Sequence, residues 1–179
     1  MSSVFADTTY DANIVLPAEL TVGVSYNLST NTILALDVNR TFWSDYKNLD
    51  VRFDGAAPPS LNPRNYEDAN IYRIGAQHNV GGGLTVRLGA YFDQSPIKDG
   101  YFAPETPRND AIGFTAGGSY QVSKRLAVDV SFLYLRFDEF KGSYDFVGHD
   151  EDPSTSDSSF AGEYKSSVLA GGFGLNYKY

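Results

Sequence analysis

The sequence predicts an all-β protein, an antiparallel transmembrane β-barrel of about seven or eight strands. Apolar residues occupy every other position over long segments: residues 20–28 alternate Leu, Val, Val, Tyr and Leu with Thr, Gly, Ser and Asn. A period of two with one apolar face is typical of a strand whose two sides meet different solvents. The last segment alternates in the same way up to Tyr179, as the closing strand of an outer-membrane barrel does. The connections between segments are alternately short and long, which also favours such a barrel.

When each alternation is extended until it fails, the chain divides into seven predicted strands. Their ranges are about 9–28, 32–42, 70–80, 84–93, 111–122, 126–137 and 164–179. Each can supply the roughly 9–11 residues that a tilted strand needs to cross a bilayer. Pro17 does not interrupt the apolar phase of the first segment, so we expect one long strand with an unpaired or bulged position at Pro17.

The lengths of the connections indicate which ends of the strands face the periplasm and which face the outside of the cell. Residues 29–31, 81–83 and 123–125 form tight turns, and long loops rich in Pro, Gly, Ser and Asp run over about 44–68, 94–110 and 138–163. Short periplasmic turns and long extracellular loops are the usual arrangement in outer-membrane barrels. A soluble antiparallel sandwich also alternates but does not explain this asymmetry. We therefore expect residues 1–179 to form a single barrel or half-barrel domain.

The composition excludes several other classes of protein. The mean hydropathy of −0.29 argues against a helical membrane protein, and no apolar run approaches the roughly 18 residues of a transmembrane helix. The absence of cysteine excludes disulfides, thiol catalysis and Cys-based metal sites. A net charge of −8 argues against nucleic acid as a partner. The aromatic share of 15%, with 13 tyrosines, suits strands that cross two membrane–water interfaces.

Charged residues on the polar parity of the strands are the first candidate site. We expect a lumen-facing network that consists of Asp37, Arg73, Arg87, Asp93 and Asp129. Such a set could act as a polar relay or gate along a transport path, or it could be an ion-pair network that fills a narrow interior and satisfies its own charges.

Aromatic residues at the strand ends are the second candidate. We expect Phe42, Trp43, Tyr177 and Tyr179 to lie at the membrane interfaces. The acidic segment 149–152 lacks the regular ligand spacing and the turn glycine of a calcium loop, so it is interpreted as a solvated loop tip. No pattern of catalytic residues can be argued. We expect no enzyme activity, no metal site and no cofactor.

Short motifs along the chain resemble those of a known family. Residues 87–96 end in Asp93-Gln94-Ser95-Pro96, an Asp-x-Ser-Pro motif at the end of a strand. The other matching motifs are Leu16-Pro17, Gly23-Val24-Ser25-Tyr26, Asp37 with Phe42-Trp43-Ser44, Tyr72-Arg73-Ile74-Gly75, Pro107 with Asp110, Gly118-Ser119-Tyr120 and Val128-Asp129-Val130. Their order and spacing are similar to those of the FadL-type outer-membrane transporters of long-chain fatty acids and other hydrophobic compounds.

The resemblance covers about residues 9–179 and implies the C-terminal half of a barrel of about fourteen strands. It implies passive uptake of hydrophobic small molecules across a bacterial outer membrane, with membrane lipid, lipopolysaccharide and a hydrophobic ligand as partners. The family's N-terminal hatch and early strands have no counterpart here, so the resemblance assigns no ligand-binding residue. The first seven residues lack the basic region and apolar core of a signal peptide, and we expect any signal to be missing from this chain.

Seven strands leave two sheet edges whose backbone groups need partners inside a membrane. These edges are the strand around Pro17 and residues 169–179. If the chain is complete, the sequence favours closure within one chain as a small barrel packed by Asp37, Arg73, Arg87 and Asp129. The alternatives are pairing with another chain, self-pairing included, and an extra strand formed in part by residues 1–8. A filled small barrel would favour a structural or surface-interaction role over transport.

Overall fold

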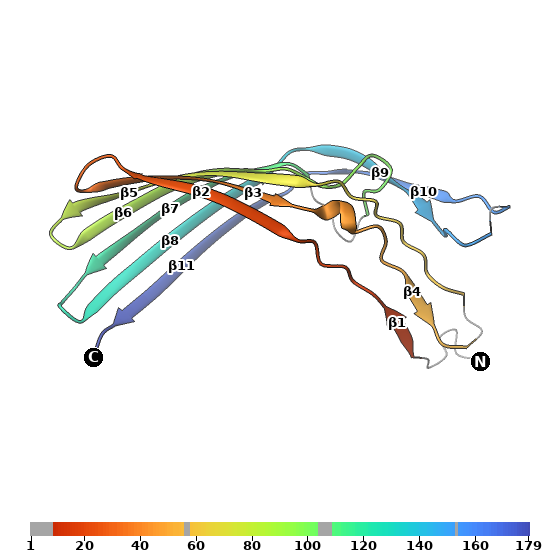
Figure 1. Cartoon of the computed structure of the whole chain (residues 1–179), viewed down its shortest axis with the longest axis horizontal. Helices are drawn as coiled ribbons and strands as arrows, with labels where there is room; N and C mark the ends of the chain where they lie inside the picture. Colours follow the sequence, from red (N-terminus) through yellow and green to blue (C-terminus); the bar gives the residue numbers. More distant parts are fainter. Residues whose placement is uncertain (1–8, 56–57, 104–108, 153) are drawn as a thin grey trace.

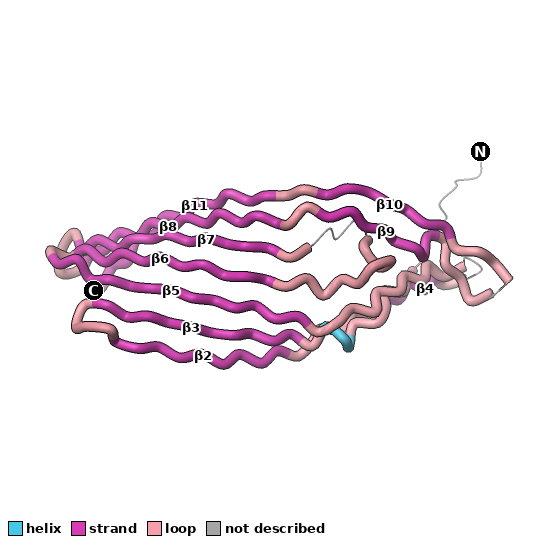
Figure 2. Tube along the Cα trace, turned by 90° about the horizontal axis from the view of Figure 1, so that it is seen from above, coloured by secondary structure: helices cyan, strands magenta, loops and turns pink. Residues whose placement is uncertain are grey.

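One curved antiparallel sheet dominates the computed structural model, which describes residues 9–55, 58–103, 109–152 and 154–179. Its seven strands lie side by side in the order β11-β8-β7-β6-β5-β3-β2 (Figures 1 and 2). Their bounds are β2 Glu19–Asn27, β3 Thr32–Thr41, β5 Ala69–Gly81, β6 Leu84–Asp93, β7 Ala111–Gln121, β8 Leu126–Phe137 and β11 Ser167–Tyr177. The all-β antiparallel prediction is therefore confirmed. The described residues contain no helix that is long and apolar enough to cross a membrane.

The first predicted strand is wrong in length. Residues 13–18 are not part of a strand, and the short strand β1 (Tyr10–Ala12) pairs with β4 (Val51–Phe53) instead of continuing the main sheet. The reason is the length of the neighbouring strand: β3 pairs with β2 only as far as Glu19 opposite Thr41, and the chain then turns into the single 3-10 turn η1 (Trp43–Asp45). Residues 13–18 therefore have no partner strand along which to form a ladder.

Two of the long loops contain regular structure of their own. The predicted loop at about 138–163 holds the hairpin of β9 (Phe140–Val147) and β10 (Ser158–Tyr164), which runs one residue past it. The predicted loop at about 44–68 holds β4 and all of η1 except Trp43. The two small sheets lie at the loop end of the main sheet (Figure 1). Aromatic packing stabilises the hairpin, because the ring of Phe102 lies 4.7 Å from that of Phe140 and 4.6 Å from that of Tyr164, measured between centroids.

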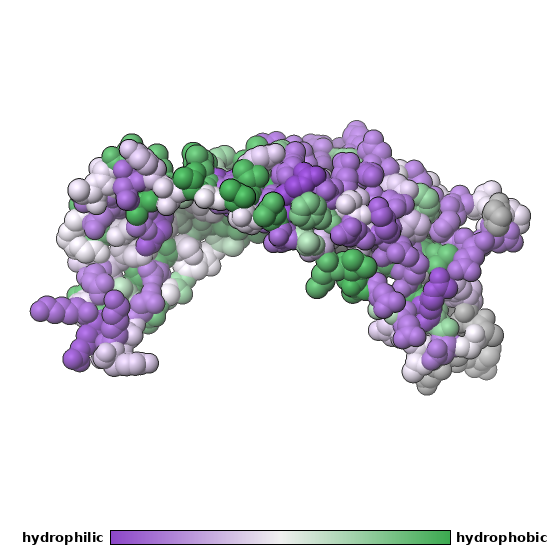
Figure 3. All heavy atoms as spheres, viewed as in Figure 1, coloured by the Kyte–Doolittle hydropathy of each residue, from purple (hydrophilic) through white to green (hydrophobic). Residues whose placement is uncertain are grey.

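The two faces of the sheet differ in polarity. Large apolar side chains are exposed along one parity of every strand; they include Leu20, Val22, Leu36, Ile74, Leu88, Phe114, Val130, Phe132, Leu169, Phe173 and Leu175. Figure 3 shows apolar side chains gathered over the strands, and hydrophilic ones over the turn end and over the loops. Buried apolar residues lie at the loop end instead, with Tyr66, Phe102 and Tyr144 the largest of them. The sheet thus has no packed core on its apolar face, as the predicted lipid-facing band requires.

The sheet is open, so the favoured closure into a small barrel is wrong for this structure. Within the described residues β2 is hydrogen-bonded only to β3, and β11 only to β8. Every neighbouring pair is antiparallel, and with seven strands the first and the last run in the same direction. If β2 met β11, of the same chain or of a second copy in the same membrane orientation, that junction would be parallel. Self-pairing stays a prediction. The extra strand involving residues 1–8 lies outside the described residues, as does Pro107.

The separation of the two edges can be measured by disulfide crosslinking, since the chain has no cysteine of its own. A Leu20→Cys/Phe173→Cys variant in detergent should form no intrachain disulfide on mild oxidation, because the residues lie on opposite edges. Val130→Cys/Phe173→Cys is the matched control: these positions are register partners on β8 and β11, and directly opposed strand residues lie at a separation that a disulfide can bridge. Efficient intrachain linkage of the Leu20/Phe173 pair on a non-reducing gel would restore the small-barrel model.

Candidate functional site

The inner face of the sheet carries two groups of hydrogen-bonded polar side chains. In the first group, Asp37 on β3 lies directly opposite Arg73 on β5, and the Arg73 guanidinium donates to the Asp37 carboxylate at 2.7 Å. Both side chains remain partly exposed, at 33% and 42%. The pair therefore compensates charge locally without being sealed from solvent.

The second group crosses five strands. Arg87 on β6 donates through Nε to Gln77 of β5 and through a terminal nitrogen to Ser119 of β7, each at 2.7 Å. The Ser119 hydroxyl donates in turn to the carboxylate of Asp129 on β8, and the Asn176 amide on β11 donates to the same carboxylate. The structure thus connects the predicted residues Arg87 and Asp129 through uncharged partners. The sequence analysis named Ser119 only as part of a motif and assigned none of these partners to the network.

The fifth predicted lumen residue lies apart from these two groups. Asp93 ends β6 at the loop side, in register with Ile71 and Ala111, and its side chain is half-buried. The two groups thus account for four of the five predicted residues. A role of this set in transport stays a prediction.

A groove separates the two polar groups. Its floor is a register row of small residues, Ala35, Gly75, Gly89 and Thr115, which lie opposite one another on β3, β5, β6 and β7. The groove has a volume of about 890 Å³ and is also lined by Asp37, Arg73, Gln77, Arg87, Tyr91 and Leu133. At Gly89 an added Cβ would lie 2.7 Å from the Thr115 hydroxyl and 3.2 Å from a backbone oxygen, so the absence of a side chain leaves the groove open down to the backbone there.

Tyr91 forms part of the wall of this groove. Its ring covers Gly113, the residue directly opposite on β7, so closely that an added Cβ there would lie 2.2 Å from two ring carbons. The Tyr91 ring thus fills the space over Gly113 and leaves the neighbouring row of small residues open. The sequence shows Tyr91 as an aromatic residue at a position that faces the polar side of its strand. That Gly113 lies opposite it follows only from the register between the strands.

The predicted interface aromatics divide between the two ends of the sheet. Trp43 packs edge-on against Tyr46 and Tyr66, with ring centroids 6.1 Å away in both cases, and the Arg40 guanidinium lies 5.7 Å from the ring centre of Phe42. Tyr177 and Tyr179 lie at the turn end and are exposed. Trp43 is therefore part of an aromatic cluster of the loops, and a membrane-interface role for the four residues stays a prediction.

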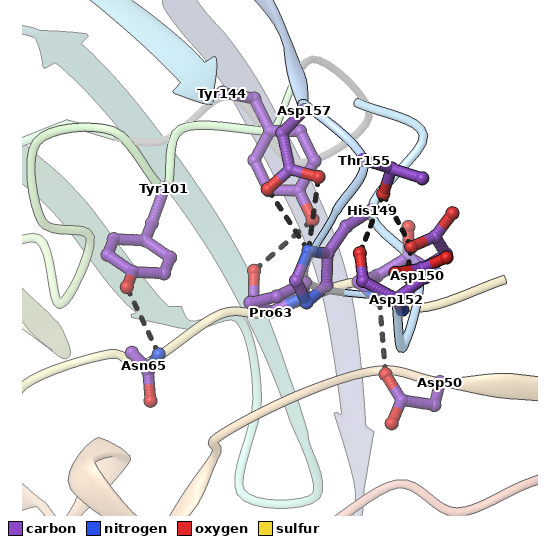
Figure 4. A network of polar contacts seen from close by, with 11 residues as sticks. Asp50, Pro63, Asn65, Tyr101, Tyr144, His149, Asp150, Asp152, Thr155 and Asp157 are labelled. Atoms are coloured by element: carbon purple, nitrogen blue, oxygen red, sulfur yellow. Dashed lines mark hydrogen bonds and ion pairs between the residues drawn. The ribbon is translucent and has the colours of Figure 1, made fainter. Parts of the chain in front are cut away.

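The acidic loop is held by local hydrogen bonds (Figure 4). His149 Nδ1 lies 3.0 Å from the Asp157 carboxylate, and the Thr155 hydroxyl donates to Asp150 at 2.7 Å. The backbone N–H of Ser154 donates to Asp152 and lowers the pKa of that carboxyl. In the part of the chain that the structure describes, no group of three or more histidine or acidic side chains is placed to hold a metal ion.

A second carboxyl at the loop end anchors the segment that follows β3. The hydroxyl and the backbone N–H of Ser44 hydrogen-bond to Asp68 and hold its pKa below the ordinary value, and Arg40 adds an ion pair at 2.9 Å. Asp68 directly precedes β5 and Ser44 lies in η1. These contacts thus join the two ends of the loop that connects β3 with β5.

An amphipathic antiparallel sheet with an apolar outer face and a grooved polar inner face is typical of the wall of an outer-membrane β-barrel. The chain belongs to the family described as outer membrane protein transport protein (OMPP1/FadL/TodX), whose model matches residues 4–179. The FadL-type resemblance is therefore confirmed. The family is one of transport proteins and not of enzymes.

Individual relatives agree with this assignment. The chain is 23% identical over 167 residues to the 47 kDa outer membrane protein of Pasteurella multocida, a match that spans 93% of this chain and 36% of the relative. It is 25% identical over 126 residues to outer membrane protein P1 of Haemophilus influenzae (70% and 27%), and 26% identical over 109 residues to the long-chain fatty acid transport protein of Salmonella typhi (59% and 25%). The two outer membrane proteins among these relatives support a location in the outer membrane.

A solved structure shows the same fold. The crystal structure of a Pseudomonas aeruginosa FadL homologue superposes with a TM-score of 0.74 at 18% identity, over 89% of this chain and 34% of that one. The matches thus span only 25% to 36% of the length of these relatives. This partial coverage fits a C-terminal portion of a larger barrel.

Proposed function

We propose that this sheet forms part of the wall of an outer-membrane barrel that takes up hydrophobic small molecules, long-chain fatty acids among them, by passive movement. The observation that carries the proposal is the groove of about 890 Å³, which the inner face leaves open between its two polar groups. A barrel wall whose interior was filled by side chains would not need a row of small residues at that level. Membership of the transport family supports the same function.

The proposal requires the two open edges to be paired with further strands. Because β2 and β11 run in the same direction, a complement that pairs antiparallel with both must contain an odd number of strands. The fourteen strands implied by the family resemblance leave seven, which is odd. A second copy of this sheet also has seven strands but, in the same membrane orientation, would meet both edges in parallel, so the proposal takes a different set of strands as the complement. A larger barrel also leaves room for a ligand that a small filled barrel would exclude.

The groove can be blocked to test the proposed function. Wild-type protein extracted in detergent should bind radiolabelled oleate saturably, and Gly75→Leu should reduce that binding about tenfold or more, since a leucine at the floor occupies the groove. An added Cβ at Gly75 approaches no atom closer than 3.6 Å, so the fold should tolerate the change. The matched control is Gly118→Leu, on the opposite face of β7, where the nearest atom to an added Cβ is 3.7 Å away. Absence of saturable binding by the wild type would reject the transport proposal.

A further inference from the structure

Arg87 and Arg73, both on the inner face, differ in the groups that their guanidinium groups contact. Arg73 faces the carboxylate of Asp37, whereas the hydrogen bonds of Arg87 go to the side-chain oxygen of Gln77 and to the hydroxyl of Ser119, both neutral. Among the described residues no carboxylate lies within ion-pair distance of its guanidinium. An arginine has five N–H donors in a planar fork, so donors remain after these two contacts. The side chain is also exposed, and it can therefore reach a further anion.

Arg87 lies beside the floor of the groove, so its positive charge is part of the groove lining. It lies one register row from the small-residue floor, on the side toward the turns, while Asp37 and Arg73 lie one row away on the side toward the loops. The groove lining holds two arginines against one aspartate, and otherwise mainly apolar or small residues such as Ile33 and Leu133. Because Asp37 compensates the charge of Arg73, the net positive charge of the lining comes from Arg87. A cation beside a floor of small residues matches a molecule with an anionic head and an apolar tail.

The floor also has a suitable length. Its four residues belong to four neighbouring strands, and a strand spacing of about 4.8 Å gives a span of about 14 Å. A dodecyl chain has a similar length, and Arg87 lies on β6, one of these four strands, one register row from the floor. Glycine at two of the four floor positions allows the chain to lie close to the backbone.

We propose that Arg87 is a specificity-determining residue that binds the carboxylate head of an amphipathic ligand while the apolar tail lies along the groove. The inference rests on the proposed function and names the ligand class at the same surface. The guanidinium forms paired N–H···O bonds with a carboxylate, which a neutral alcohol of the same chain length cannot accept in that geometry. The residue thus selects anions among hydrophobic molecules.

Dodecanoate and dodecanol share a tail and differ in charge, which makes them the probes. Wild-type protein in neutral detergent should bind dodecanoate at least about tenfold more tightly than dodecanol, the usual scale for a hydrogen bond to a charged group. Arg87→Gln should remove this preference by weakening dodecanoate alone, and Arg87→Lys should retain part of it. Arg125→Gln is the matched control, because it removes an exposed arginine at the turn between β7 and β8, outside the groove.

The outcomes separate this inference from the proposed function. If Arg87→Gln binds dodecanoate as tightly as the wild type does, the proposed role of Arg87 is wrong. The proposed uptake of hydrophobic molecules is unaffected by that result. Binding of neither probe by the wild type would overturn both proposals. A measurement without any variant adds an independent test: dodecyltrimethylammonium, a cation with the same tail, should displace bound dodecanoate at least about tenfold less well than unlabelled dodecanoate does. Equal displacement would also overturn the inference.

Discussion

Replacing Leu88 by arginine should destabilise the protein in a bilayer by about 2–4 kcal/mol, the cost of an arginine near the membrane midplane on the lipid face of a barrel. Leu88 lies at the middle of β6, at the centre of the sheet, and 66% of it is exposed on the apolar face. The cause is desolvation, because a guanidinium placed there finds neither water nor a carboxylate in the hydrocarbon. Urea titration of the protein in phospholipid vesicles, followed by tryptophan fluorescence of Trp43, measures the change.

Val122→Arg is the matched control for the depth of the substituted residue in the membrane. Val122 is similarly exposed, at 53%, but it follows the end of β7 and lies next to a short turn. Its cost should be only about 0–1 kcal/mol, since an arginine near the interface reaches water and head groups. Equal costs at the two positions, or no cost at Leu88, would contradict the assignment of this face to lipid.

Replacing Gly113 by alanine should destabilise the protein by about 1–3 kcal/mol, the usual range for overpacking a filled site. The added methyl would occupy the space of the Tyr91 ring, which must then rotate into the groove. Removing the ring should remove the cost. The coupling energy from the double-mutant cycle of Gly113→Ala with Tyr91→Ala should therefore be close to the full effect of the single glycine substitution.

The control for this cycle lies on the same strand. Gly118→Ala places its methyl where the nearest atom is 3.7 Å away, so it should change stability little and show no coupling to Tyr91→Ala. A similar loss at Gly113 and Gly118 would mean that the cost comes from the strand backbone and not from the tyrosine ring.

The strands could be predicted where alternation and a tight turn act together. β6 and β8 have the predicted bounds, because each is joined to a neighbour by a short turn that sets where the ladder starts. Prediction failed where alternation continued without a partner, as before Glu19, and where short strands formed inside a long loop, as at β9 and β10. Periodicity reports which face a side chain takes, and hydrogen-bonded pairing depends on the length of the neighbouring strand.

The charged residues of the candidate site could be predicted from parity, but their contacts could not, because the contacts depend on the register between strands. Parity placed the charges of Asp37, Arg73, Arg87 and Asp129 on one face, and the structure connects them as two groups. Their neutral partners and the row of small residues depend on register between strands. Across the loop of residues 44–68 no turn signal sets that register, so the pairing of Asp37 with Arg73 could not be derived from spacing alone.

The seven strands of the described sheet give it a sidedness that labelling can use. β2 starts at the loop end and β11 finishes at the turn end, so β1 and the β9–β10 hairpin lie at one end of the sheet and Tyr177 lies at the other (Figure 1). With the loops outside the cell, an epitope inserted in that hairpin would be visible to antibodies on intact cells. A reporter joined after Tyr177 would instead face the periplasm. One doubly labelled chain would thus carry the epitope outside the cell and the reporter in the periplasm.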